Sequence, residues 1–303
     1  MFQFNKDQQI FDIAGVKVGG QPGQLPTVLL GSIFYHKEKL VEDAKNAKFD
    51  KGVAEQLLKQ EEALSNETGN PRIVDVCCAW PQAFPKFIEF VANTIDGAFA
   101  IDGTTPEVRI AGAKYAAEVG LSNRIVYNSI TPHTKEEEIT ALKESKIRSA
   151  ILLTLNAANP TLSGRLEVID DALSTANKAG IQNILVDTTV LDIPDPGPVS
   201  KAIYLIKEKY GLPAGGGLHN AMDRWKERGK LESDEYTMGT IVANIFPIVM
   251  GANFILYGPI ERASNIYFTC GLADAYVAYN IVQEYGKRPL VSNHPLMKIF
   301  KDR

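Results

Sequence analysis

The sequence predicts an α/β fold, a single (β/α)₈ barrel that spans residues 1–303. Short apolar or β-branched runs recur along the chain with helix-like segments between them, which indicates βα units around a parallel sheet. Several runs are apolar without alternation, as expected for strands that are covered on both faces. A doubly wound sheet is the competing architecture, but eight units without a dinucleotide-binding fingerprint favour the barrel.

The predicted elements follow one another in regular alternation. The strand-like runs cover residues 27–33, 72–77, 98–102, 124–129, 150–155, 183–187, 213–219 and 253–257. Apolar residues at helical spacing predict helices over residues 51–65, 81–95, 107–119, 135–144, 166–179, 198–210, 236–250 and 266–284. Residues 1–26 are polar and glycine-rich, and they predict an N-terminal hairpin or lid that covers a barrel end.

Composition and charge exclude several classes of protein. Hydrophobic residues make up 45% and charged residues 22% of the chain, as in ordinary soluble proteins. The net charge is −4 without a dense Lys/Arg cluster, which argues against a nucleic-acid partner. The N-terminus lacks the pattern of a signal peptide, and no apolar run reaches the roughly 18 residues of a membrane span. We therefore expect a cytoplasmic protein without membrane insertion.

Polar side chains end three of the predicted strands. Asp102, Asn128 and Asp187 each follow a buried run directly. In a (β/α)₈ barrel the active site is built at the rim where the strands end. Each residue alone could cap the next helix, but their convergence on one mouth predicts a binding site. Acceptors and amide groups suit a flat, hydrogen-bonding ring better than a phosphate or a metal.

Four further residues are candidates for the same mouth. Asp75 lies within the second predicted strand and either faces the mouth or orients its neighbours. His219 and Asn220 follow three glycines, which would let a ligand approach closely. His219 is either a general acid or a satisfied core histidine. Asn156, in the loop after the fifth strand, either lines the pocket or serves the turn.

No metal site or covalent machinery is evident in the sequence. The four histidines show no metal-ligand spacing, and a Gly-x-Ser-x-Gly motif is absent. Cys77, Cys78 and Cys270 cannot form a complete disulfide framework. Cys77 and Cys78 should point to opposite faces of a strand, which is poor geometry for binding one metal ion. Because free cysteines are often buried, we predict that the cysteines are small core residues. A thiol nucleophile at Cys77 or Cys78 is the disfavoured alternative, and we expect no protein-bound metal.

Ordered motifs over nearly the whole chain resemble a known family. They are Gly19-Gly20-Gln21-Pro22-Gly23, Pro26-Thr27, Gly31-Ser32-Ile33-Phe34-Tyr35, Val41-Glu42-Asp43, Phe49-Asp50-Lys51, Thr68-Gly69-Asn70-Pro71, Tyr127-Asn128-Ser129-Ile130, Gly217-Leu218-His219-Asn220-Ala221, Tyr257-Gly258-Pro259-Ile260-Glu261 and His294-Pro295-Leu296. This set resembles the H subunit of tetrahydromethanopterin S-methyltransferase and its relatives, which include soluble methylcorrinoid:tetrahydrofolate methyltransferases. The resemblance implies a barrel of the pterin-binding type.

The wider superfamily implies roles for the strand-end residues. Asp102 in Ile101-Asp102-Gly103-Thr104, Asn128 and Asp187 are similar to the residues that hold the pterin ring in that superfamily. Asn220 corresponds to the Asn that closes the seventh strand in the corrinoid enzymes. Gly103 stands where Ser is frequent, and the lysine and glycine of the synthase phosphate site are missing. Both departures fit a methyltransferase better than a dihydropteroate synthase.

The resemblance thus implies methyl transfer between a methylated corrinoid protein and N5 of tetrahydrofolate. Asn220 and Asp102 are the expected catalytic residues, and Asp75, Asn128, Asn156, Asp187 and His219 the expected additional pterin contacts. The cobamide would be supplied by the partner protein, and a homodimer is expected. Tetrahydromethanopterin as the substrate, a dihydropteroate-synthase-like enzyme and a non-catalytic subunit remain the alternatives.

Overall fold

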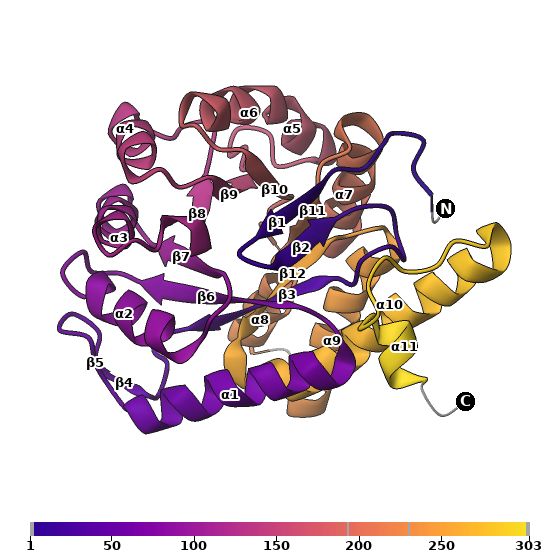
Figure 1. The fold of residues 1–303 in the computed structure, drawn as a ribbon, viewed down its shortest axis with the longest axis horizontal. Coiled ribbons are helices and arrows are strands. Elements are labelled where there is room, and N and C mark those ends of the chain that lie inside the picture. The colour runs from indigo at the N-terminus through magenta and orange to yellow at the C-terminus, as the bar shows by residue number, and fades with distance from the viewer. Residues whose placement is uncertain (1–2, 193, 230, 301–303) are drawn as a thin grey trace.

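Eight parallel strands close into a barrel that helices surround (Figure 1). The computed structural model describes residues 3–192, 194–229 and 231–300. In barrel order the strands are β3 (Val28–Ile33), β6 (Arg72–Cys78), β7 (Phe99–Gly103), β8 (Ile125–Ile130), β9 (Ser149–Leu153), β10 (Asn183–Asp187), β11 (Ala214–Gly216) and β12 (Phe254–Pro259), which pairs again with β3. The (β/α)₈ barrel predicted from the sequence is confirmed.

The helices follow the predicted positions with three differences. They are α1 (Lys51–Thr68), α2 (Phe84–Thr94), α3 (Pro106–Glu118), α4 (Glu136–Ser145), α5 (Leu162–Glu167), α6 (Ile169–Lys178), α7 (Pro196–Tyr210), α8 (His219–Glu227), α9 (Ser233–Val249), α10 (Ala263–Tyr285) and α11 (Pro295–Ile299). The helix expected over 166–179 is divided between α5 and α6, which a turn at Val168 separates. Helices α8 and α11 were not predicted. A short hairpin of β4 (Val41–Asp43) and β5 (Lys48–Phe49) was also missed.

The seventh strand is shorter than the sequence predicted. The prediction placed residues 213–219 in a strand that ended at His219, whereas β11 ends at Gly216 and His219 begins α8. The backbone amide of Asn220 donates to the Gly217 carbonyl, so the chain turns immediately after the glycines. Glycines have no side chains that could pack on a face of the sheet, so they weaken a strand. The strand therefore extends only over the residues that pair with the neighbouring strands.

Alternate residues of each strand fill the barrel interior. Leu30, Ile73, Ala100, Val126, Ile151, Leu185 and Phe254 form the inner cluster. Their neighbours along the strands, such as Leu29, Val74 and Ile101, pack outward against the helices. Because successive side chains point to opposite faces of a strand, this alternation fixes which later residues face inward at the rim.

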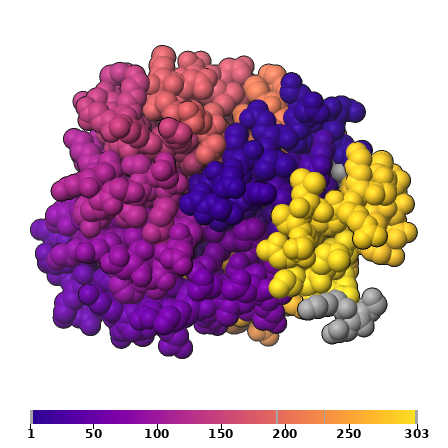
Figure 2. Space-filling model, viewed as in Figure 1, coloured from indigo at the N-terminus to yellow at the C-terminus, as the bar shows by residue number. Residues whose placement is uncertain are grey.

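The N-terminal segment forms the predicted hairpin and closes the barrel end where the strands begin. Strands β1 (Ile10–Ile13) and β2 (Val16–Gly19) pair antiparallel, and Ile13 and Val18 join the inner cluster. The Gln9 amide donates to the Gly211 carbonyl, which precedes β11. Figure 2 shows this segment, in indigo, across the middle of that face. The hairpin therefore lies opposite the strand-end rim and is no lid over it.

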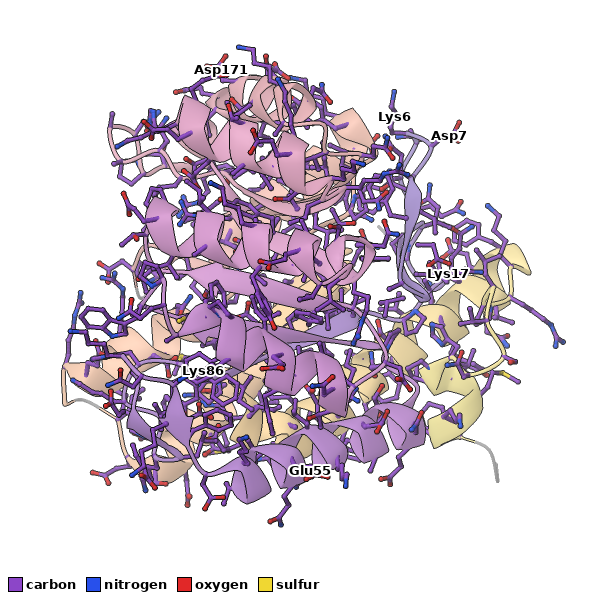
Figure 3. The ribbon with its side chains drawn as sticks, turned by 60° about the vertical axis from the view of Figure 1, so that its left-hand side comes forward. Lys6, Asp7, Lys17, Glu55, Lys86 and Asp171 are labelled. Atoms are coloured by element: carbon purple, nitrogen blue, oxygen red, sulfur yellow. The ribbon has the colours of Figure 1, made fainter. Side chains whose placement is uncertain are left out.

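Helix α1 is attached to the barrel through a buried glutamate. Asp50 caps its start by accepting from the Val53 amide, whereas Glu55 points outward (Figure 3). Inside, Glu61 is fully buried and accepts from the Tyr257 hydroxyl of β12 at 2.6 Å. A Cβ at Gly31 would lie 2.1 Å from that hydroxyl, so the contact requires glycine on β3.

Within the described residues, none of the helices combines the length and the apolar character that a membrane crossing needs.

Candidate functional site

Five polar side chains share the inward-facing layer at the strand-end rim. Ser32, Asp75, Asp102, Asn128 and Asp187 each stand two residues after a member of the inner cluster. Pairing places Ser32 beside Asp75, and Asp102 beside Asn128, on neighbouring strands. The period of two along each strand therefore carries these polar groups into the barrel mouth.

Asp75 is the centre of a hydrogen-bond network in this layer. Its side chain is 2% exposed and receives the Ser32 hydroxyl on Oδ2 at 2.8 Å. The Asn128 side-chain amide donates to Asp75 Oδ1 at 3.2 Å. These contacts fit the interpretation in which Asp75 orients its neighbours, and they also fix the Asn128 side chain for a ligand above it.

The Cys77 thiol lies between two carboxyl groups. Its Sγ is 3.6 Å from Asp75 Oδ2 and 3.7 Å from Asp102 Oδ2. The interpretation of Cys77 as a core residue is therefore wrong, because it faces the half-buried mouth. Cys78 points to the opposite face and is buried, as predicted, and Cys270 is also buried. Burial and the two carboxyls raise the pKa of the Cys77 thiol well above its usual range, which argues against a thiolate nucleophile.

Asp75, Cys77 and Asp102 also form a group that could hold a metal ion. One ligand atom from each residue lies within 4.8 Å of the others. The search for metal ligands at short spacing in the sequence did not find this group, because Asp102 comes from a different strand. Hydrogen bonds from Ser32 and Asn128 already satisfy Asp75, and the absence of a bound metal stays a prediction.

Burial raises the pKa values of the rim carboxyls. It raises the pKa of Asp102 to about 8, with the neighbouring Asp75 as the second cause. Burial likewise raises the pKa of Asp75, and it raises that of Asp187 to about 6. Near neutral pH the Asp75–Asp102 pair can therefore hold a proton, so it offers both a donor and acceptors to a ligand.

Asp187 and Asn220 approach the mouth from the β10 and β11 side. Asp187 is 7% exposed, and its Oδ1 accepts from the Thr189 amide at 2.7 Å. A Cβ on Gly216 would lie 3.1 Å from the same oxygen, so glycine lets β11 come close. Asn220 is exposed, and its side-chain amide has no hydrogen-bond partner in the described part of the chain.

His219 is held as a neutral core histidine. Its Nδ1 lies 2.8 Å from the Leu256 carbonyl oxygen, and a carbonyl can only accept, so Nδ1 carries the hydrogen. Burial lowers the pKa of His219 to about 4. The Nε2 atom is 3.7 Å from Asp223 Oδ2, on α8, and a Cβ at Gly258 would lie 2.7 Å from it. The core-histidine alternative fits this geometry better than the general acid.

Asn156 serves its own loop. Its Nδ2 donates to the Gly164 carbonyl at 3.1 Å, and its Oδ1 accepts from the Asn159 amide at 3.1 Å. The structure therefore does not bring Asn156 together with the Asp75 network. Ser32 is a rim residue that the sequence analysis did not propose, although its spacing of two residues from Leu30 could have indicated it. Cys77 was considered only as a disfavoured nucleophile, although its spacing of four residues from Ile73 could have placed it at the rim.

Comparison with known families identifies the relationship. The family described as "Tetrahydromethanopterin S-methyltransferase MtrH subunit" matches residues 6–288. The chain belongs to this family.

Curated relatives match this chain over nearly its full length. The H subunit of tetrahydromethanopterin S-methyltransferase from Methanothermobacter thermautotrophicus is 39% identical, covering 99% of this chain and 100% of the relative. The H subunit of the putative methyltransferase mtx from Methanosarcina barkeri is 37% identical and covers 98% and 99% of the two chains.

Solved structures of other proteins share the fold of this chain. A Yersinia pestis dihydropteroate synthase with a pterine–sulfa conjugate has a TM-score of 0.65 at 11% identity, covering 89% of this chain and 98% of the synthase. The Xanthomonas albilineans synthase with 7,8-dihydropteroate has a TM-score of 0.59 at 13% identity, covering 91% and 98%. At such identity the likeness concerns the fold alone, and it agrees with the (β/α)₈ barrel of the structure.

Proposed function

We propose that this chain transfers a methyl group between N5 of a tetrahydropterin and the corrinoid of a partner protein. The observation that carries the proposal is the inward-facing set of Asp75, Asp102, Asn128 and Asp187 at one rim, in a chain of the MtrH family. The partner's corrinoid would supply a cobalt centre that carries the methyl group.

The chemistry of these side chains fits a pterin ring. The pyrimidine edge of a pterin presents an amino group and a ring N–H, which one carboxylate can accept together. An asparagine amide donates and accepts at once, and Asn128 is held in place by Asp75. The rim thus offers several hydrogen-bond acceptors, and the Asp75–Asp102 pair can also donate. This combination matches a flat ring with several N–H groups.

Methyl transfer between cobalt and an amine nitrogen needs alignment and exclusion of water more than a strong base. Asn220, with its free amide at the start of α8, is the residue that we expect to orient N5. Asp102 would supply or receive the N5 proton, since its pKa of about 8 lies near neutral pH. The neutral and enclosed His219 is not needed for either role.

The substrate that we favour is tetrahydromethanopterin. The sequence analysis expected tetrahydrofolate, whereas the curated relatives are named for tetrahydromethanopterin. Both molecules share the tetrahydropterin ring, so the rim residues do not separate them.

Single-turnover transfer from free methylcobalamin tests the function. The purified chain would be incubated with tetrahydromethanopterin, tetrahydrofolate or no pterin, and the N5-methylated product would be measured by mass spectrometry. We expect product with tetrahydromethanopterin at a higher rate than with tetrahydrofolate. Loss of product in Asp187→Ala would place the reaction at the rim. Failure of the wild-type chain with both pterins, in conditions where it binds them, would refute catalysis and favour a non-catalytic role.

A further inference from the structure

Arg165 is a fully buried arginine next to the strand-end rim. It belongs to α5, the helix that follows β9, and it is 1% exposed. Arginine is almost never buried completely unless its charge and its N–H groups have partners. The guanidinium must therefore be held by specific contacts, and these contacts connect it to Asp187.

The guanidinium joins the loops that follow β9 and β10. In the first loop, Nη1 donates to the Pro160 carbonyl at 2.7 Å. In the second loop, Nε lies 3.0 Å from the Thr188 carbonyl oxygen and 3.1 Å from that of Thr189. Nη2 pairs with Asp195 at 2.7 Å, so all three nitrogens of the guanidinium have a partner.

Thr189 is held in a backbone conformation that threonine rarely adopts. Its φ is 51°, in the left-handed region, where a β-branched residue is a genuine outlier. Such a conformation persists only when its surroundings fix it, and it is common at functional sites. Here Arg165 holds the Thr189 carbonyl, and the Thr188 amide donates to the Gly215 carbonyl of β11.

This conformation turns the Thr189 amide toward Asp187. The amide donates to Asp187 Oδ1 at 2.7 Å, whereas Oδ2 receives no hydrogen bond from the described residues and is not enclosed. Burial raises the pKa of Asp187 to about 6, and the Thr189 amide is the contact that opposes this rise. The amide thus orients the carboxyl group and favours its ionised form, which can only accept hydrogen bonds.

We infer that Arg165 is a positioning residue for Asp187. By holding Thr189 in its strained conformation, Arg165 keeps the Thr189 amide on Oδ1 and leaves Oδ2 of Asp187 to the pterin ring. The inference rests on the proposed function. Arg165 contacts no reacting atom in this assignment, and it acts only through the carboxyl group that binds the ring.

A double-mutant cycle on pterin affinity tests this coupling. Arg165→Lys keeps a positive charge near Asp195, but an ammonium lacks the planar fork that reaches both loops. Calorimetric titration with tetrahydromethanopterin should show about tenfold weaker binding. In an Asp187→Ala background the same substitution should weaken binding less than about twofold, because the carboxyl group through which it acts is gone. An equal loss in both backgrounds would overturn the inference.

Relief of the strain at Thr189 gives a second measurement. Thr189→Gly keeps the amide and adopts a positive φ readily, so it should restore most of the affinity that Arg165→Lys loses. Lys146→Gly is the matched control, because Lys146 has a φ of 54° at the end of α4, before β9 begins at the opposite barrel end. It should restore none of the affinity. Equal restoration by both glycines, or none by Thr189→Gly, would mean that Arg165 only stabilises the fold.

Thr189→Pro carries the test if Arg165→Lys does not fold. It removes the amide hydrogen and leaves the guanidinium in place. Binding should weaken about tenfold in the otherwise wild-type chain and less than about twofold in the Asp187→Ala background, and equal losses would overturn the inference. Wild-type chain that binds neither tetrahydromethanopterin nor tetrahydrofolate would instead overturn the proposed function, so the two failures are distinguishable.

Discussion

At the residue scale, the rim carboxyls decide how tightly the pterin is held. We predict that Asp187→Ala and Asp102→Ala each weaken pterin binding by about 2–4 kcal/mol, because hydrogen bonds to the ring are lost and the polar groups of the ring are left unpaired. Calorimetric titration measures the affinity. Asp96→Ala, which removes an exposed carboxylate outside the rim, is the control and should bind normally. Wild-type affinity in both rim variants would exclude these residues as the pterin contacts.

The raised pKa of Asp102 predicts a dependence of stability on pH. Since the folded-state pKa of about 8 lies above the usual value, the folded chain binds more protons than the unfolded chain between about pH 4 and 8. The contribution of Asp102 to the free energy of unfolding should therefore fall as pH rises through this window, by at most about 1.4 kcal/mol per pH unit.

Urea titrations at about pH 5 and pH 8 measure this difference. Glu38 and Asp187 contribute in the same direction, because burial raises the pKa of each. Asp102→Asn should therefore reduce the difference without abolishing it. An equal difference in the variant and the wild type would show that Asp102 does not hold the proton.

Asn220 and His219 should separate orientation from acid–base chemistry. Asn220→Ala should lower the single-turnover methyl-transfer rate about tenfold or more while it weakens pterin binding less, because the lost contact is needed mainly for alignment of N5. His219→Ala should do less to the rate, since His219 is neutral and enclosed. If Asn220→Ala transferred at the wild-type rate while His219→Ala was inactive, the acid–base interpretation of His219 would replace ours.

At the element scale, the N-terminal hairpin should stabilise the barrel without contributing to the site. Ile13 is 1% exposed in the inner cluster, so Ile13→Ala should cost about 2–5 kcal/mol of unfolding free energy through the cavity it leaves. The KM for the pterin should stay near wild type, because the hairpin closes the opposite barrel end. Ile10→Ala, at an exposed position of the same hairpin, should cost little. A raised KM at unchanged stability in Ile13→Ala would contradict this assignment.

The loops after β3 and β6 show how elements depart from their local patterns. The β4–β5 hairpin and the positive φ of Phe34 depend on contacts with distant segments, such as the packing of Phe49 on Phe87. Local propensity does not depend on such distant contacts. The sequence therefore predicted the neighbouring strands and not this hairpin. Helix α8 was missed for the same reason.

At the scale of the whole molecule, the chain should act without a resident metal. We expect elemental analysis of the purified chain to find less than stoichiometric zinc, cobalt and iron, because Asp75 is already satisfied by two hydrogen-bond donors. The cobalt of the reaction would then arrive only with the partner. Stoichiometric metal that is lost in Asp102→Ala would instead identify the group of Asp75, Cys77 and Asp102 as a metal site. The homodimer expected from the resemblance stays a prediction.

The sequence by itself determined the barrel and most of the polar layer. Hydrophobic runs of strand length between helical segments allow few arrangements, and Asp102, Asn128 and Asp187 end such runs in the linear order. Their inward direction follows from the period of two after Ala100, Val126 and Leu185. These features depend on local periodicity, which can be read from a single sequence.

The tertiary structure decided which candidates meet. Only the closure of the sheet brings Ser32, Asp75 and Asn128 into one network, places Cys77 between two carboxyls, and encloses Glu38 beside the mouth. The same closure turns His219 against Leu256 and leaves Asn156 to its own loop. Hydrogen bonds and burial between residues distant in sequence depend on how strands pack around the barrel, and that packing sets the proton affinities on which the proposed chemistry depends.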